Sequence, residues 1–288
     1  MYLIWKILVA ACLLSPLAYG AEKQVGETEG RGSVLAMMLG EQDSSLMLYP
    51  YDTNYIIYTY GANINRQAIH SYDWADHARK DEASFQISFG FPLLRGIAGK
   101  DSLFGASYTQ RSWWQFSNKK ESSPFREINY EPQLFLAWLT DYEFAGWHLR
   151  EIETGFNHQS NGRSGETSRS WNRLYARFMV QNGNWQVDFK PWYRLPESSR
   201  RDDNPDMNRY MGHYRLKVGY IWGDSVFTAQ GRYNWNSGYG SGVLGWSYPL
   251  SKHVRLYTQL FTGYGESMID YNFKQTRFGI GVMLNDML

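Results

Sequence analysis

The chain has 288 residues, with 29 Lys and Arg against 28 Asp and Glu, and a single Cys. The length suits one large domain or two small ones, and a formal net charge of +1 gives no reason to expect nucleic acid as a partner. Cys12 lies in the first twenty residues, so a chain that loses them has no thiol. This excludes disulfide frameworks, Cys-zinc sites, iron–sulfur clusters and thiol nucleophiles.

Residues 1–20 have the form of a secretory signal peptide. Lys6 precedes a short apolar run at 7–14, and Ala18 and Gly20 place small residues before a cut after position 20. The alternative is an N-terminal membrane anchor, for which the run is short. We expect an exported chain, with a short N-terminal arm at 21–50 and one domain at 51–288.

Alternation with period two runs through most of that domain. One face of a segment carries Leu174 and Phe178, for example, while the other carries Arg173 and Arg177. The pattern predicts an all-β fold of twelve strands, at 51–61, 81–92, 101–115, 129–140, 143–157, 169–181, 184–195, 212–223, 225–236, 239–249, 253–264 and 270–285.

The connections between these strands also alternate in length. Tight turns are predicted near 141–142, 182–183, 223–224 and 250–252, and long polar loops at 62–80, 116–128, 158–168 and 196–211. An even strand number with long loops at one end is typical of an antiparallel transmembrane β-barrel of the bacterial outer membrane. A soluble sandwich or lipocalin-like barrel is the alternative, with apolar rows inside and charges outside.

Charged residues recur on the polar rows of the predicted strands. In a barrel of this size we expect them to pair inside and fill the lumen, not to line a wide pore. These residues are Glu151, Glu153, Arg173, Arg177, Asp188, Lys190, Arg215 and Lys217.

A polar cluster interrupts the lipid-facing rows. His158 and Ser160 share the parity of Phe156, and Asn172 shares that of Leu174, so all three face hydrocarbon across one hairpin. Polar groups in that position are costly and suggest a function. The cluster suggests a lipid hydrolase with Ser160 as nucleophile, His158 as general base and Asn172 holding the imidazole tautomer. The alternative is that they are headgroup-level polar residues of an ordinary loop.

Five segments, in order, closely resemble the outer-membrane phospholipase A family. They are Tyr-Pro-Tyr-Asp-Thr-Asn-Tyr at 49–55, Tyr-Thr-Gln-Arg-Ser-Trp-Trp at 108–114, residues 121–138, residues 155–175 with their Asn-His-Gln-Ser-Asn-Gly-Arg-Ser run, and Tyr-Asn-Trp-Asn-Ser-Gly-Tyr-Gly at 233–240. The resemblance implies a twelve-stranded outer-membrane barrel that is active as a homodimer with its active site on the outer-leaflet side. It also implies Ca²⁺-dependent hydrolysis of phospholipids and lysophospholipids, with A1, A2 and lysophospholipase activities.

The same resemblance assigns roles to single residues. The family's His, Ser and Asn fall on the three residues of the polar cluster, and the Gly162 amide would contribute to an oxyanion hole. The family's calcium site falls on the Arg163 carbonyl, the Ser168 hydroxyl and Ser122 of the partner subunit. These are all oxygen donors, which suits Ca²⁺.

Gln110 supports a dimer from the residues alone. Its parity matches Phe104 and Tyr108, so its amide faces lipid, where a hydrogen bond across a twofold axis would stabilise it; a position near the water interface is the alternative.

The segment 194–201 is longer than the family pattern leads us to expect, and we expect this to affect only a loop. The acidic run at 202–206 lacks the Gly and Glu of an EF-hand, so we interpret it as a solvated loop.

Two other classes of function remain open at this level. A non-enzymatic outer-membrane pore or adhesin would use the same barrel without chemistry at His158. A soluble periplasmic carbohydrate-binding barrel would place the apolar rows inside.

Overall fold

The computed structural model describes residues 34–40, 47–200 and 202–284. The predicted signal peptide and most of the predicted arm therefore lie outside the described residues. All described residues belong to one compact unit, Gly32–Leu288. Its strands are β1 Tyr49–Pro50, β2 Tyr55–Gly61, β3 Asp81–Arg95, β4 Ser102–Trp114, β5 Phe125–Phe144, β6 Trp147–Ser160, β7 Ser170–Asn182, β8 Trp185–Arg194, β9 Tyr214–Trp222, β10 Ser225–Asn234, β11 Tyr239–Pro249, β12 Arg255–Gly263 and β13 Gln275–Met283.

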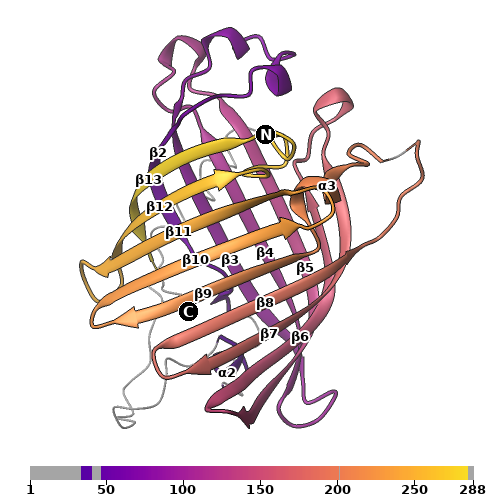
Figure 1. Ribbon diagram of the computed structural model, residues 1–288, viewed down its shortest axis with the longest axis vertical. Helices are drawn as coiled ribbons and strands as arrows, with labels where there is room; N and C mark the ends of the chain where they lie inside the picture. Colours follow the sequence, from indigo (N-terminus) through magenta and orange to yellow (C-terminus); the bar gives the residue numbers. More distant parts are fainter. Residues whose placement is uncertain (1–33, 41–46, 201, 285–288) are drawn as a thin grey trace. The chain divides into compact units, whose positions relative to one another are not determined.

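Strands β2 to β13 form a closed antiparallel barrel of twelve strands, as predicted (Figure 1). Each pairs with its neighbours in sequence, and β13 closes the ring on β2 through pairs such as Ile280 with Tyr58. The two-residue β1 pairs with β3 beyond the end of β2. Within the described residues, closure leaves none of the twelve ring strands at a sheet edge, which is the condition for strands that face hydrocarbon.

Short helical segments occupy the connections and the start of the described chain. They are α2 Val34–Gly40, η1 Gln67–Ile69, η2 Ala75–His77, η3 Lys119–Glu121, η4 Gly165–Thr167 and α3 Met207–Met211. Helix α2 packs against β1 and β3 to β5, where Met38 is buried and its carbonyl accepts a hydrogen bond from Arg95 Nε at 2.8 Å. Among the described residues, no helix has the length and apolar character needed to cross a membrane.

Several predicted boundaries were wrong. The turn predicted near 141–142 lies at 145–146, because the ladder between β5 and β6 continues to the pair of Phe144 with Trp147. Three others were wrong for identifiable reasons. Residues 51–54 do not extend β2, because Asp52 and Asn54 bond to Ser88 instead. The loop predicted at 158–168 begins at 161, because the ladder between β6 and β7 continues to Ser160. The last strand begins at 275 and not at 270, because the preceding segment 264–274 folds into the mouth of the barrel.

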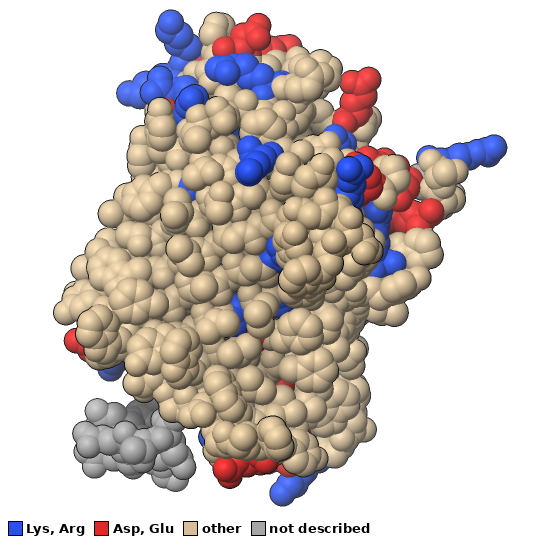
Figure 2. Space-filling model, viewed as in Figure 1, with Lys and Arg blue, Asp and Glu red and all other residues tan. Residues whose placement is uncertain are grey.

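The apolar rows face outward and the charged rows inward, which excludes the soluble barrel. Leu134, Phe156, Leu174 and Leu244 lie on the outer rows and are 39–58% exposed. Figure 2 shows a broad middle belt nearly free of charged side chains, with Lys, Arg, Asp and Glu gathered at the two ends. This distribution matches a lipid-facing band between two aqueous surfaces.

Inside the barrel, the predicted charged rows pair with one another. Asp188 Oδ2 lies 2.8 Å from Arg177 and 3.1 Å from Arg215. Glu153 accepts hydrogen bonds from the hydroxyls of Tyr51 and Tyr175. A polar cavity remains among these groups. The expectation of a crowded, ion-paired lumen is therefore confirmed.

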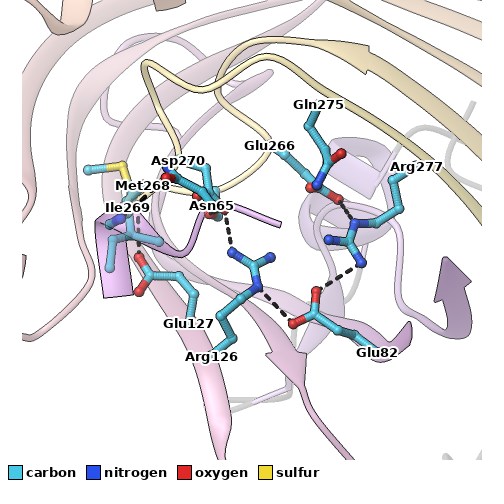
Figure 3. A network of polar contacts seen from close by, with 12 residues as sticks. Asn65, Glu82, Arg126, Glu127, Glu266, Met268, Ile269, Asp270, Gln275 and Arg277 are labelled. Carbon is cyan, nitrogen blue, oxygen red and sulfur yellow. Dashed lines mark hydrogen bonds and ion pairs between the residues drawn. The ribbon is translucent and has the colours of Figure 1, made fainter. Parts of the chain in front are cut away.

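The segment 264–274 closes the loop end of the barrel through a buried ionic network (Figure 3). Arg126, 2% exposed, pairs with Glu82 and with Asp270 of this segment. Arg277 joins Glu82 at 2.9 Å to Glu266 at 2.8 Å. Burying several charges stabilises the fold only when each is compensated, so this network fixes the segment in one position.

Candidate active site

The polar cluster predicted from parity lies at the loop end of β6 and β7. His158 is opposite Asn172 in the antiparallel register, and Ser160 is opposite Ser170. All four share the outward row of Phe156 and Leu174, while the alternate residues of both strands point into the barrel. His158, Ser160 and Asn172 are half-buried, so they lie on the outer wall within reach of lipid.

A hydrogen bond joins two of these residues. His158 Nδ1 lies 2.8 Å from Asn172 Oδ1. An amide oxygen can only accept, so the proton is on Nδ1, which leaves Nε2 free to accept a proton. Ser160 lies two residues from His158 on the same face, and among the described residues its hydroxyl forms no hydrogen bond. The pair therefore provides an oriented base beside an uncommitted hydroxyl.

Gly162 follows directly after β6 in a conformation that only glycine adopts easily. Its φ is +64°, and a Cβ at this position would lie 2.9 Å from Cε2 of Tyr130. Within the described part of the chain, its amide donates to no acceptor. The amide is thus exposed and available to bind an anionic oxygen two residues from Ser160.

Asn161 organises the loop that carries Gly162. Its buried side chain donates to the Thr167 carbonyl at 2.8 Å and accepts from the amides of Arg169 and Arg163 at 2.9 and 3.3 Å. A single side chain thereby closes the loop between β6 and β7. Sequence reasoning missed this residue, because an Asn in a polar loop carries no periodic signal.

The predicted calcium donors lie in the same loop and in the one between β4 and β5. Ser168 donates its hydroxyl hydrogen bond to Asp203 Oδ2 at 2.6 Å, and Ser122 is exposed with a left-handed φ of 56°. Across the described residues no group of three His, Cys, Asp or Glu could hold a metal. The donors are a carbonyl, hydroxyls and one neighbouring carboxylate, a set that fits Ca²⁺.

The side chain of Arg163 fixes the backbone that would offer the predicted carbonyl. It donates to the Arg126 carbonyl at 3.0 Å and lies 3.4 Å from Glu127. Its guanidinium also lies over the ring of Tyr72, 4.6 Å from the centroid. Burial raises the pKa of Tyr72, so this phenol is neutral at physiological pH.

The loop after β8 reaches the cluster, contrary to the expectation that its extra length affects only a loop. Asn172 Nδ2 donates a hydrogen bond to Glu197 Oε1 at 3.3 Å. The acidic run at 202–206 is not simply solvated either. Asp202 pairs with Arg194 at 2.6 Å, and the buried Asn204 accepts a hydrogen bond from the Ser170 amide at 2.9 Å.

Gln110 lies on the outer row of β4, because its neighbours Thr109 and Arg111 line the internal cavity. Its Oε1 accepts a hydrogen bond from Tyr108 at 3.0 Å, and its Nε2 donates to Ser112 at 3.2 Å. A half-buried amide is thus presented on the lipid-facing wall.

Comparisons with known proteins point to one family. The sequence profile of the Phospholipase A1 family matches residues 34–284. Phospholipase A1 of Escherichia coli K12 is 61% identical over 284 residues, which is 97% of both chains.

Solved structures give the same result. Outer membrane phospholipase A from Escherichia coli, unmodified and with an active-site asparagine replaced by alanine, aligns with a TM-score of 0.87 and 63% identity over 90% of this chain and 100% of that one. The calcium-bound dimer of the Salmonella typhi outer membrane phospholipase aligns with a TM-score of 0.86 and 62% identity, over 90% of this chain and 99% of that one.

Proposed function

The chain belongs to the phospholipase A1 family of outer-membrane esterases, and from this premise we propose that Ser160, His158 and Asn172 hydrolyse acyl esters of membrane phospholipids and lysophospholipids. The observation that carries the proposal is the hydrogen bond between His158 and Asn172 on the lipid-facing row of the barrel. A base in that position meets substrate that never leaves the bilayer. The active-site asparagine of the Escherichia coli relative supports the role of Asn172.

The chemistry follows from the positions of the groups. Ser160 attacks the ester carbonyl carbon while His158 Nε2 takes its proton, and Asn172 Oδ1 holds the opposite ring nitrogen. The carbonyl oxygen of the ester becomes anionic and accepts a hydrogen bond from the Gly162 amide. As the intermediate collapses, His158 returns the proton to the leaving alcohol. A water molecule, activated by the same imidazole, then releases the fatty acid from Ser160.

The serine needs no bond to His158 before substrate arrives, because catalytic hydrogen bonds of unliganded enzymes are often long and tighten in the complex. A neutral amide as third member also suits this location. An unpaired carboxylate on the lipid-facing wall would carry a large desolvation cost.

We propose that Ca²⁺ binds at the Arg163 carbonyl and the Ser168 hydroxyl, with Ser122 of the partner subunit completing the site. Bound Ca²⁺ would supply positive charge near the developing oxyanion, a contribution of roughly several kcal/mol. The calcium-bound dimer of the Salmonella typhi relative supports this arrangement. Dimerisation and Ca²⁺ binding would then act as one switch, because each protomer alone has an incomplete donor set.

We place the active site on the outer-leaflet side, since it lies at the end of the barrel that carries the long loops. Fatty-acid release from mixed micelles of phospholipid and detergent, measured with the purified protein in Ca²⁺ and in excess chelator, tests the proposal. We expect release from both diacyl phospholipid and lysophospholipid in Ca²⁺, and none in chelator. Equal release under both conditions would contradict the calcium requirement, and no release under either would contradict the proposed chemistry.

A further inference from the structure

We infer that Glu197 is a positioning residue for this site: its carboxylate holds the Asn172 side chain in the one orientation that places the amide oxygen against His158. The inference rests on the proposed function and adds to it a fourth residue, from the loop after β8. Two hydrogen bonds meet at the Asn172 side chain. Its Nδ2 donates to Glu197 Oε1, and its Oδ1 accepts from His158 Nδ1.

The side-chain amide of an asparagine is nearly symmetric in shape. Rotation by half a turn about its last bond exchanges oxygen and nitrogen with little change in shape. In the reversed state the amide NH₂ would face His158, which could then present only an acceptor at Nδ1. The proton would move to Nε2, and the nitrogen facing Ser160 would no longer be a base. The site therefore needs a device that selects one amide orientation.

An ionised carboxylate is such a device, because it accepts hydrogen bonds and cannot donate them. Facing Glu197, the Asn172 side chain must present its NH₂ to the carboxylate and hence its oxygen to the imidazole. Orientation then passes in sequence from Glu197 to Asn172, to the His158 tautomer and to the free Nε2. Hydrogen bonds to charged groups are also stronger than neutral ones, which favours the selected state.

The backbone around Glu197 is fixed independently of its side chain. The Leu195 amide donates to the Asn172 carbonyl at 2.8 Å, and Pro196 restricts the backbone between this bond and Glu197. On the other side of Glu197, Asp202 and the Asn204 carbonyl bind the Arg194 side chain, at 2.6 and 3.0 Å. The loop thus remains anchored when the carboxylate is removed, so Glu197 has no evident task in holding the loop itself.

The extra length of segment 194–201 acquires a role in this account. A carboxylate placed directly on β6 or β7 in the outer row would face lipid without a partner. Glu197 instead reaches Asn172 from a connecting loop and remains half-buried at the rim. The site gains an anionic positioning group without placing one in the lipid-facing row.

The test uses Glu197→Ala, Glu197→Gln and Asn172→Asp, alone and combined, with Glu143→Gln as the control that removes one exposed acidic charge at the opposite end of the barrel. For Glu197→Ala we expect kcat to fall about 10-fold with KM unchanged. Glu197→Gln retains an acceptor oxygen for Asn172, so its kcat should stay within about threefold of the unmodified enzyme.

The combined variant separates positioning from a structural role. Asn172→Asp alone places a second carboxylate against Glu197, and like charges at this separation repel. We expect Asn172→Asp with Glu197→Gln to be at least about fivefold more active than Asn172→Asp alone, because the amide introduced by the second substitution can donate to the carboxylate introduced by the first. A residue that only holds the loop would not restore activity in this way.

Nitrogen-15 spectra of histidine-labelled protein provide a readout besides turnover, with the His158 signals identified by a His158→Gln variant. We expect the Nδ1-protonated tautomer to predominate in the unmodified protein and to lose population in Glu197→Ala. Unchanged tautomer and kcat in Glu197→Ala, with no rescue in the combined variant, would overturn the inference. Retained activity in Ser160→Ala would instead overturn the proposed function, so the two failures are distinguishable.

Discussion

Asn172 lies directly opposite His158 in the pairing of β7 with β6, and its Oδ1 is 2.8 Å from His158 Nδ1. The contact depends on register, because a shift of one residue would turn Asn172 into the lumen. The barrel wall thereby presents an oriented imidazole to lipid.

Gly162→Ala should reduce kcat strongly, because its Cβ would meet the Tyr130 ring at 2.9 Å and displace the amide proposed to bind the oxyanion. Loss of one such donor typically lowers kcat about 10²- to 10³-fold. Gly165→Ala is a matched control from the same loop, with a φ of +62° and nothing within 4 Å of the added atom. Kinetics on phospholipid micelles should show a far larger loss for Gly162→Ala; equal losses would mean that backbone strain alone explains the effect.

Ser168→Ala should weaken Ca²⁺ binding, because it removes a hydroxyl donor and the contact with Asp203. Isothermal titration with Ca²⁺ in detergent, with a nonhydrolysable substrate analogue present, should show a dissociation constant at least about 10-fold higher. Ser170→Ala, two residues further along, should leave the dissociation constant unchanged. Crosslinked dimers should form only with analogue and Ca²⁺ together, and equal crosslinking in chelator would contradict the proposed switch.

Gln110→Leu should weaken the dimer by removing the lipid-facing amide of β4. Interhelical and comparable hydrogen bonds in membranes contribute ~0.6–2 kcal/mol, so the dimer dissociation constant should rise about 3- to 30-fold. Sedimentation equilibrium in density-matched detergent measures this change. Thr262→Val, which removes an exposed polar group from the outer row of β12, is the control. Equal effects of the two substitutions would argue against a specific interface at Gln110.

Arg126→Ala should destabilise the barrel, because Asp270 would lose its buried arginine partner and Glu82 would keep only Arg277. Breaking such a network typically costs about 3–5 kcal/mol of unfolding free energy. Arg150→Ala, which breaks an exposed pair with Asp141, should cost less than about 1 kcal/mol. Urea titrations in detergent compare the two.

In planar bilayers the unmodified protein should show no stable channel; a steady conductance would support the pore alternative.

Much of this site could be predicted, because the parity of a residue in its strand determines which face of the barrel wall it occupies. Asn172 shares a row with Leu174, and His158 and Ser160 share one with Phe156, so the period of two predicts that all three lie on the outer wall. Neither periodicity nor parity extends to loops. Glu197 contacts Asn172 from 25 residues further along the chain, and Asp203 contacts Ser168 from 35 residues further along. Asn161 acts through backbone contacts, which leave no pattern in the sequence.

The wrong start of the last strand has a related origin. Segment 264–274 contains apolar residues such as Met268 and Ile269 that resemble the start of a strand. They are buried because the segment folds into the barrel mouth, where Glu127 and Asn129 accept hydrogen bonds from their amides. Alternation along the sequence cannot distinguish apolar residues buried in a loop inside the barrel from apolar residues buried in a strand.

The most direct test of the central claim compares Ser160→Ala with Ser170→Ala. The two serines are opposite each other on the same outward row, so both variants lose one hydroxyl from the same patch of the barrel wall. Fatty-acid release from phospholipid micelles in saturating Ca²⁺ should vanish in Ser160→Ala and persist in Ser170→Ala, with heat-modifiable migration showing both barrels intact. Undiminished release by Ser160→Ala would contradict the account.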